Sequence, residues 1–307
     1  MEKIIVIAGP TAVGKTSLSI ELCKILDGEV VSADSMQVYK GLDIGTAKPT
    51  ISEMQGVRHH MLDVCIPSHR YSVAEYVSDA TCAIKDIFSR GKTPIVVGGT
   101  GLYIDHLLYE TDFREGENDP ALRELLTDRA NKEGGAQLKK ELSEFDPETA
   151  SRLHDNDIKR IIRAIEFYRV TGKPIAEHNK ENSYVKKRYD ADFYVLACER
   201  EELYRRINLR VDQMMDKGLL EEARKVCLSD WFSNSTASQA IGYKEFMPYF
   251  TSGVPLESCI EILKQHSRNY AKRQLTWFRG KKEAVFLDIF DSVSPFDIII
   301  NSFRKGK

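Results

Sequence analysis

The chain has 307 residues, of which 42 % are hydrophobic and 29 % are charged, and its formal net charge is -2. This composition excludes a disordered or fibrous protein, and the length suffices for two domains or for one large domain with an insertion. The near-neutral total disfavours a protein that coats nucleic acid, because such proteins usually carry an excess of Lys and Arg.

No segment of the sequence predicts attachment to a membrane. The longest apolar runs, such as residues 4–8 and 95–97, are far shorter than the roughly 18 residues that a spanning helix needs. The first residues lack the basic, apolar and small-residue succession of a secretory signal, so we expect a cytoplasmic protein. Its 6 cysteines stand singly, without the spacing of a zinc site, and are expected to be reduced.

The first hundred residues alternate between strand-like and helix-like patterns. Lys3–Ala8 is a short β-branched run typical of a buried strand, Ser17–Leu26 has a helical period, and Glu29–Ser32 predicts a second strand. A further helix, Val73–Ser89, precedes a third strand, Thr93–Gly98. This order favours an α/β fold with a parallel sheet flanked by helices.

A phosphate-binding loop lies between the first strand and the first helix. Its sequence GPTAVGKT comprises Gly9, Pro10, Thr11, Ala12, Val13, Gly14, Lys15 and Thr16, and it matches the complete G-x-x-x-x-G-K-[ST] pattern. Successive backbone N–H groups and the helix N-terminus form an anion cradle, Lys15 adds a point charge, and the Thr16 hydroxyl can hold Mg²⁺. The sheet is therefore predicted to be of the P-loop NTPase-like type.

The middle of the chain has a different charge pattern. Residues 110–148 hold 12 acidic and 6 basic residues, whereas residues 156–188 hold 9 basic and 4 acidic ones. The acidic part contains no strand-like run, and the strand pattern returns at Phe193–Ala197. We therefore predict a mainly helical insertion domain over residues 113–189. Residues 1–112 and 190–307, on either side of this insertion, are predicted to form the catalytic core together.

Two long helical patterns follow, Glu201–Val226 and Pro255–Lys281. The segment 264–282 carries 7 Lys and Arg residues, no acidic residue, and several aromatic side chains. Positive charge together with stacking surface is typical of a site for single-stranded nucleic acid. Part of this helix must also pack in the core, and Leu275 and Trp277 are the predicted core residues.

The ends of the strands distinguish phosphate binding from ATP hydrolysis. A nucleoside triphosphatase needs an Asp at the tip of a neighbouring strand to hold the metal, but the third strand is followed by Gly99, Thr100 and Gly101. The only carboxylate predicted at a strand tip close to the loop is instead Asp34, after the second strand. Its residue type allows a general base, a metal ligand or a local cap.

Seven blocks of the sequence resemble the bacterial tRNA dimethylallyltransferases, also called tRNA isopentenyltransferases or the IPP transferase family. The blocks are GPTAVGKT (9–16), SADSMQVYKGLDIGTAKP (32–49), VVGGTGLY (96–103), NDIKRIIRAIE (156–166), RRINLRVDQMMDKGLLEEAR (205–224), TASQAIGYKE (236–245) and RNYAKRQLTWFR (268–279). The resemblance implies transfer of a dimethylallyl group from dimethylallyl diphosphate to N6 of the adenine on the 3′ side of the tRNA anticodon, position 37.

The resemblance also implies roles for individual residues. Asp34 is implied as the general base, Thr100 as a hydroxyl at the reacting centre, and Arg210 as a cationic contact to the diphosphate. The residues after Asp34 would line the pocket of the target base, and they are Ser35, Met36 and Gln37. Two structural alternatives stay open, because Thr100 could cap a helix and Arg210 could be a solvated surface charge.

The predicted partners are the tRNA anticodon stem-loop and dimethylallyl diphosphate, with Mg²⁺ as cofactor. The predicted tRNA contacts outside the catalytic residues are Arg123, Lys159, Arg160, Arg163, Gln239, Gly242, Tyr243 and Lys244. Lys159, Arg160 and Arg163 are predicted to share one helix face. The alternative interpretation is that this face is exposed to solvent and contacts no tRNA. Eukaryotic relatives add a zinc finger, and this sequence lacks that Cys/His spacing, so zinc is not expected. We also expect the protein to be a monomer.

Three other functions fit parts of the sequence. An adenylate isopentenyltransferase acting on free AMP shares the first three blocks, but it has little use for the insertion or the basic helix. A small-molecule kinase would hold ATP in the phosphate loop, and the missing metal-binding Asp on the third strand disfavours it. A non-catalytic nucleic-acid-binding module does not need a complete phosphate loop.

Overall fold

The computed structural model describes residues 2–110, 119–181 and 186–305. The chain divides into two compact units, one formed by Met1–Tyr109 with Lys187–Lys307 and the other by Glu110–Lys186. The predicted insertion ends at residue 189, three residues beyond this second unit, and its predicted start at Phe113 lies outside the described residues.

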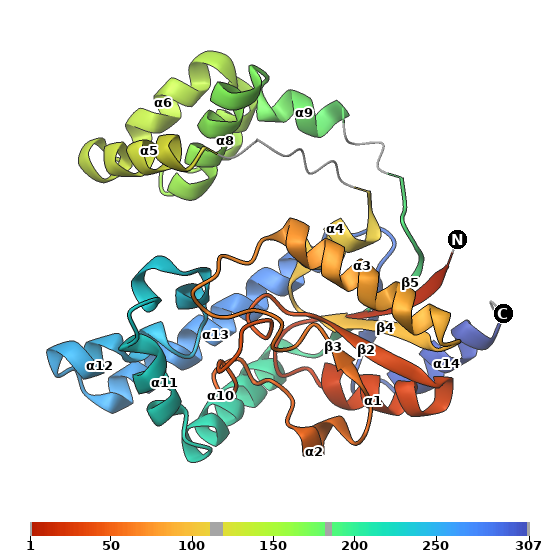
Figure 1. Ribbon diagram of the computed structural model, residues 1–307. Helices are drawn as coiled ribbons and strands as arrows, with labels where there is room; N and C mark the ends of the chain where they lie inside the picture. Colours follow the sequence, from red (N-terminus) through yellow and green to blue (C-terminus); the bar gives the residue numbers. More distant parts are fainter. Residues whose placement is uncertain (1, 111–118, 182–185, 306–307) are drawn as a thin grey trace. The chain divides into compact units, whose positions relative to one another are not determined.

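The first unit contains a six-stranded sheet in which every pair of neighbouring strands is parallel (Figure 1). The strands are β1 (Lys3–Ala8), β2 (Gly28–Ala33), β3 (His59–His60), β4 (Thr93–Gly98), β5 (Asp190–Ala197) and β6 (Val285–Asp288), in the spatial order β3-β2-β4-β1-β5-β6. Val6 of the central strand pairs with Val96 on one side and with Phe193 on the other. The predicted parallel α/β sheet is confirmed.

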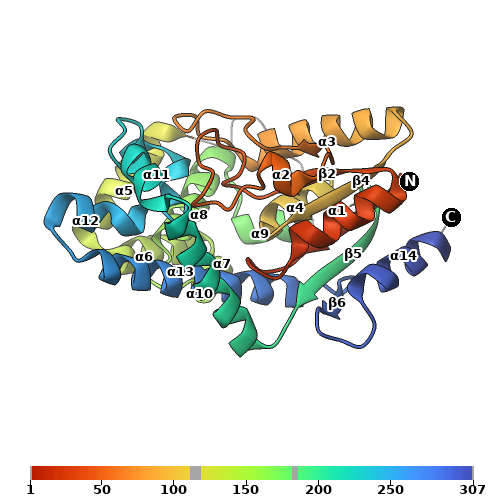
Figure 2. The same ribbon diagram turned by 90° about the horizontal axis from the view of Figure 1, so that it is seen from below.

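Helices cover both faces of this sheet, as Figure 2 shows for the same unit. Helices α1 (Lys15–Leu26) and α14 (Pro295–Lys305) share one core with alternate residues of β1, among them Ile5 and Ile7. Helices α3 (Val73–Ser89) and α4 (Gly101–Leu108) pack together through the stacked rings of Tyr76 and Tyr103. Because both faces are covered, residues 4–8 of β1, 30–31 of β2 and 95–97 of β4 are apolar and buried, as in other parallel sheets.

The remaining helices of this unit gather at the carboxyl ends of the strands. They are α2 (Ile51–Met54), α10 (Arg200–Asp216), α11 (Leu219–Cys227), α12 (Met247–Ser252) and α13 (Leu256–Arg279), with short 3-10 turns at Phe232–Asn234, Thr236–Gln239 and Lys244–Phe246. The prediction of one helix over residues 201–226 is wrong. The chain breaks at Gly218, whose φ of 96° lies in the left-handed region that glycine adopts readily.

Within residues 119–181 of the second unit, every regular element is a helix. Its helices are α5 (Pro120–Glu133), α6 (Gly135–Phe145), α7 (Pro147–Arg152), α8 (Ile158–Thr171) and α9 (Ile175–Glu181). They enclose a core of their own, to which α6 contributes Leu138 and Leu142 and α8 contributes Ile161 and Ile165. None of the helices in the described parts of either unit has the length and apolar character needed to cross a membrane.

Candidate active site

A cavity of about 1100 Å³ opens in the first unit at the carboxyl ends of β1, β2 and β4. This edge of a parallel sheet is the usual place for a ligand in an open α/β fold. Twelve predicted site residues line the cavity, namely Thr11, Ala12, Gly14, Lys15, Thr16, Asp34, Ser35, Met36, Gln37, Arg210, Gln239 and Lys244. The fold thus joins the phosphate loop, the segment after β2 and helix α10 around one space.

The phosphate loop holds its lysine in a compact arrangement. Lys15 Nζ donates to the carbonyl oxygens of Gly9, at 3.0 Å, and Pro10, at 2.7 Å. Removal from water and the nearby Arg210 guanidinium lower the pKa of Lys15 from 10.5 to about 7, and the Asp34 carboxylate opposes this shift. An anion bound in the loop would restore the favourable charge balance of the ammonium.

Asp34 directly follows β2 and faces the cavity. Its Oδ1 accepts hydrogen bonds from the backbone N–H groups of Met36, at 2.9 Å, and Gln37, at 3.3 Å. This local turn is the cap that an Asp in such a position can form. No described residue donates to Oδ2, so the second oxygen is free to accept a proton.

Thr100 follows β4 and occupies the N-cap position of α4, but its side chain forms no capping hydrogen bond. Its Oγ1 instead accepts from the backbone N–H of Ser35 at 3.0 Å and lies 3.3 Å from Ser35 Oγ. The hydroxyl therefore ties β4 to the Asp34 turn and does not cap the helix.

Arg210 projects from α10 into the cavity. Its Nη2 lies 3.4 Å from the carbonyl oxygen of Ala47, and removal from water lowers the pKa of the guanidinium while Asp34 opposes the shift. The neighbouring Arg205 and Arg206 instead pair with Glu202, at 2.7 and 2.9 Å. Arg206 also lines the cavity, but its guanidinium is paired with Glu202, whereas Arg210 forms no ion pair with a described residue.

Several polar residues of α13 line the cavity, among them Tyr270 and Gln274, and neither was singled out as a site residue from the sequence. The Gln274 side chain is 5 % exposed, accepts from the N–H of Thr11 at 3.0 Å and donates to the carbonyl of Gly99 at 2.9 Å. A Cβ on Gly99 would lie 2.0 Å from Gln274 Nε2, so this approach requires glycine. Tyr270, one turn earlier, also lines the cavity, and the Arg273 guanidinium lies over its ring. Gln274 stands on the buried stripe of the helix, and a polar residue there was the available signal.

The basic segment 264–282 is divided between several surroundings. Lys264 pairs with Asp212 at 2.8 Å, Arg268 donates to Asn208 at 2.7 Å, and Lys281 pairs with Asp105 at 2.6 Å. The cations at 272, 273, 279 and 282 are exposed, and Arg273 also lines the cavity. The core assignment of Trp277 is wrong, because its ring is 40 % exposed and its indole N–H donates to Asp105 at 3.0 Å; Leu275 is partly buried against a small core cluster.

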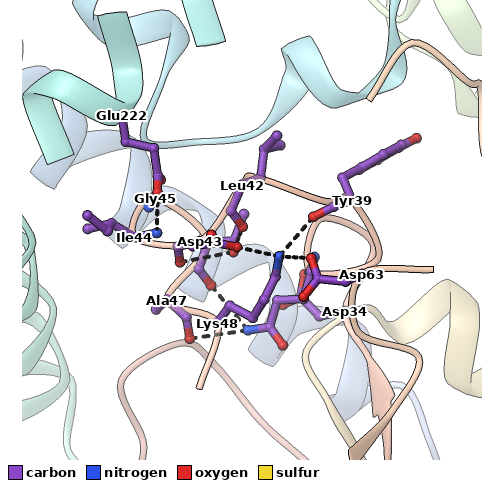
Figure 3. Close-up of polar contacts among 12 residues, drawn as sticks. Asp34, Tyr39, Leu42, Asp43, Ile44, Gly45, Ala47, Lys48, Asp63 and Glu222 are labelled. Carbon is purple, nitrogen blue, oxygen red and sulfur yellow. Dashed lines mark hydrogen bonds and ion pairs between the residues drawn. The ribbon is translucent and has the colours of Figure 1, made fainter. Parts of the chain in front are cut away.

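The predicted base-pocket residues line the cavity, but the Gln37 side chain is already engaged. Its Nε2 donates to the carbonyls of Thr46, at 3.1 Å, and Ala47, at 3.3 Å, and its Oε1 lies 3.3 Å from Ser32 Oγ. In this arrangement the amide anchors the segment 42–48, part of which is drawn in Figure 3. To form hydrogen bonds with the target base, the Gln37 side chain would first have to break these contacts.

The segment 239–244 has a side toward the cavity and a side away from it. Gln239 and Lys244 line the cavity, and Lys244 Nζ donates to the Gln239 carbonyl at 3.3 Å. Gly242 and Tyr243 are buried, and the Tyr243 hydroxyl donates to Glu222 at 2.8 Å. These two residues contact Gly45 and support the cavity wall from behind.

The predicted tRNA contacts of the second unit differ in their surroundings. Glu166 is fully buried and binds Arg123 at 2.6 Å and Arg163 at 3.4 Å, and the Arg163 guanidinium also lies over the Phe167 ring. Lys159 and Arg160 are exposed at the start of α8. The exposed pair is thus the part of this face most open to a partner.

The donor set of the cavity fits a magnesium ion that is brought in with a polyphosphate. The described residues contain no group of three or more His, Cys, Asp and Glu side chains able to hold a metal by themselves. Thr16 and Asp34 both line the cavity beside the phosphate loop and provide hard oxygen atoms. Mg²⁺ commonly uses one or two protein oxygens together with phosphate oxygens and waters, which is what this set offers.

Comparisons with known proteins agree with this geometry. Residues 37–281 match the family model described as IPP transferase. A Bacillus cytotoxicus protein named tRNA dimethylallyltransferase is 46 % identical over 308 aligned residues, covering 100 % of this chain and 96 % of that protein.

Solved structures are similar over the whole chain. A tRNA isopentenylpyrophosphate transferase from Staphylococcus epidermidis superimposes with a TM-score of 0.73 at 42 % identity, and each chain is covered completely. A eukaryotic dimethylallyltransferase, solved while acting on tRNA, gives a TM-score of 0.84 at 33 % identity and covers 100 % of this chain and 80 % of that one.

Proposed function

Because the chain belongs to the IPP transferase family of tRNA dimethylallyltransferases, we propose that it transfers a dimethylallyl group from dimethylallyl diphosphate to N6 of adenine 37 in tRNA. The product would be N6-dimethylallyladenosine beside the anticodon. One observation carries the proposal: a phosphate loop and a carboxylate with a free oxygen, Asp34, line the same cavity. The loop suits the leaving diphosphate, and the carboxylate suits the incoming amine.

The diphosphate end of the cavity would promote departure of the leaving group. When the C1–O bond of the allylic diphosphate breaks, the electron pair leaves with the diphosphate, whose added charge must be stabilised. Among the groups that line the cavity, Lys15, the loop N–H groups and Arg210 could do so. Mg²⁺, held by the Thr16 hydroxyl with diphosphate oxygens, would supply further positive charge.

The other end of the cavity would accept the proton. As the N6 lone pair forms the new bond to C1, N6 must lose a proton, and Asp34 Oδ2 is placed to accept it. Thr100 would hold the turn that carries Asp34, through the hydrogen bond that its Oγ1 accepts from the Ser35 N–H. This contact would orient the Asp34 carboxylate within the cavity.

Recognition of the tRNA requires a base outside its stack. An enzyme that alters a base in a folded loop must take that base into a closed pocket, and here Ser35 and Met36 would line it. Lys159 and Arg160 would contact phosphates from the helical unit, which we propose to be the tRNA-binding insertion domain. We further propose that the chain works as a monomer in the cytoplasm, without zinc.

The acceptor tests this proposal. We expect the protein to prenylate unmodified tRNA with adenine at position 37 when dimethylallyl diphosphate and Mg²⁺ are present and ATP is omitted. AMP in place of tRNA should remain unmodified, as measured by chromatography of the nucleosides. Prenylation of AMP but not tRNA would identify an adenylate isopentenyltransferase, and phosphate transfer that depends on ATP would identify a kinase.

The phosphate contacts of the helical unit predict a change in salt dependence. The slope of log affinity for tRNA against log salt concentration is negative. Replacing both Lys159 and Arg160 by Ser should make this slope less steep by about 1.4 to 1.8, since each phosphate contact contributes ~0.7 to 0.9 to its magnitude. Glu124→Gln, an exposed change on α5 that removes no positive charge, is the matched control. Filter binding between low and moderate salt measures the slope, and an unchanged slope would assign this face to solvent.

A further inference from the structure

The segment 42–48 forms part of the cavity wall and holds one strained residue. Ala47 has a φ of 50°, in the left-handed region that non-glycine residues rarely adopt. The Ala47 carbonyl accepts hydrogen bonds from Gln37 Nε2 at 3.3 Å and from Arg210 Nη2 at 3.4 Å. Strain of this kind persists only where the surroundings enforce it, and it often marks a functional position.

One carboxylate enforces this conformation from behind the cavity wall. Glu222, on α11, accepts the N–H of Ile44 with Oε2 at 3.0 Å and the N–H of Gly45 with Oε1 at 2.9 Å (Figure 3). The Tyr243 hydroxyl donates to the same Oε1 at 2.8 Å. Glu222 is not among the residues that line the cavity, so it acts on the segment and not on a ligand.

The fit behind Gly45 is tight. A Cβ on Gly45 would lie 2.6 Å from Cζ of the Tyr243 ring, so the backbone can approach Tyr243 and Glu222 this closely only with glycine. On the other side of the segment, Lys48 Nζ donates to the Tyr39 carbonyl at 2.8 Å and binds Asp43 at 2.6 Å. The segment is thereby fixed at both of its ends.

We propose that Glu222 is a positioning residue for the diphosphate half of the active site. By fixing the N–H groups of residues 44 and 45, it sets the position of the Ala47 carbonyl and thus the direction of the Arg210 guanidinium. This inference rests on the proposed function, because it takes Arg210 as the contact to the leaving diphosphate. Loss of the two hydrogen bonds between Glu222 and this segment should weaken the binding of dimethylallyl diphosphate and leave the tRNA contacts of the helical unit intact.

Glu222→Gln tests the role of these two hydrogen bonds, because it removes the carboxylate with little change in side-chain shape. The amide has one acceptor oxygen for two backbone N–H groups, and its own NH₂ group would face one of them. We expect KM for dimethylallyl diphosphate to rise about tenfold, as loss of a hydrogen bond to a charged group allows, with KM for tRNA unchanged. Glu222→Asp keeps the charge on a shorter side chain and should give an intermediate value. Glu221→Gln, an exposed change on the same helix, is the matched control.

A double-mutant cycle separates positioning from a general structural role. In an Arg210→Ala background, Glu222→Gln should add almost nothing to the loss, because the residue that it positions is gone. Independent multiplication of the two effects, or an equal rise of both KM values, would overturn the proposal. So would a KM for dimethylallyl diphosphate that stays unchanged in both Glu222 variants. Wild-type protein in the same assay reports on the proposed function separately, through the acceptor that it modifies.

Discussion

Replacing Asp34 by Asn is expected to lower kcat by about 10²- to 10⁴-fold, the usual contribution of a positioned general base. The amide keeps an oxygen for the N–H groups of Met36 and Gln37, so the turn after β2 should remain in place. The substitution removes the second carboxylate oxygen. No described residue donates a hydrogen bond to that oxygen, and we propose that it accepts the N6 proton. Single-turnover kinetics with saturating tRNA measure the effect on the chemical step.

The affinity for tRNA serves as the control for this variant. It should change little in Asp34→Asn, and Asp297→Asn, the same change at an exposed position on α14, should keep full activity. Asp34→Ala removes the turn contacts as well and should be at least as impaired. A large loss of tRNA affinity with most of kcat retained would make Asp34 a binding residue and not the base.

Replacing Lys15 by Ala is expected to lower kcat/KM for dimethylallyl diphosphate by roughly 10²- to 10³-fold, as removal of one preorganised group that stabilises developing charge does elsewhere. The ammonium now bonded to the carbonyls of Gly9 and Pro10 is the nearest positive charge that the loop can offer a diphosphate. The tRNA affinity should be unaffected, since Lys15 lies within the phosphate loop.

The same lysine predicts a pH dependence with a definite sign. The pKa of Lys15 is lowered to about 7 in the free protein, so above that pH binding of the diphosphate must take up a proton. KM for dimethylallyl diphosphate should therefore rise with pH above about 7, by at most tenfold per pH unit. Lys15→Ala should lack this rise and so serves as the control for ionisation of the substrate. The same rise in both proteins would contradict the assignment.

The sequence predicted the parts of the fold that depend on local pattern. The strands at β1, β2 and β4, the phosphate loop between β1 and α1, and the helical character of residues 119–181 follow from periodicity and composition. Two features were too short to show a pattern, β3 with two residues and β6 with four. The break at Gly218 was visible as a glycine, but isolated glycines are tolerated inside helices and the prediction ran through it.

The candidate site was predictable where a motif carried it. Lys15, Asp34 and Arg210 line one cavity, although Arg210 and Asp34 are far apart in the sequence. Gln274 and Glu222 were missed because their roles come from contacts across the fold. Gln274 bonds to Thr11, 263 positions away, and Glu222 bonds to Ile44, 178 positions away. A single sequence contains no periodicity from which such pairs can be recognised.

The net charge shows the same difference between local and global information. A total of -2 suggested little affinity for nucleic acid, yet it sums an acidic block at residues 110–148 and basic blocks at residues 156–188 and 264–282. In the structure, buried Glu166 binds Arg123 and Arg163, while Lys159 and Arg160 stay exposed. The cations open to a tRNA phosphate are therefore fewer than the sequence count implies.

The most direct test of the account locates the transferred group. An unmodified anticodon stem-loop is incubated with the protein, dimethylallyl diphosphate and Mg²⁺, then digested with nuclease and analysed by tandem mass spectrometry. We predict one dimethylallyl group per stem-loop, on N6 of adenosine 37. A group on any other nucleotide, on a ribose hydroxyl, or no transfer at all unless ATP is added would contradict a site that joins the phosphate loop to Asp34 for this reaction.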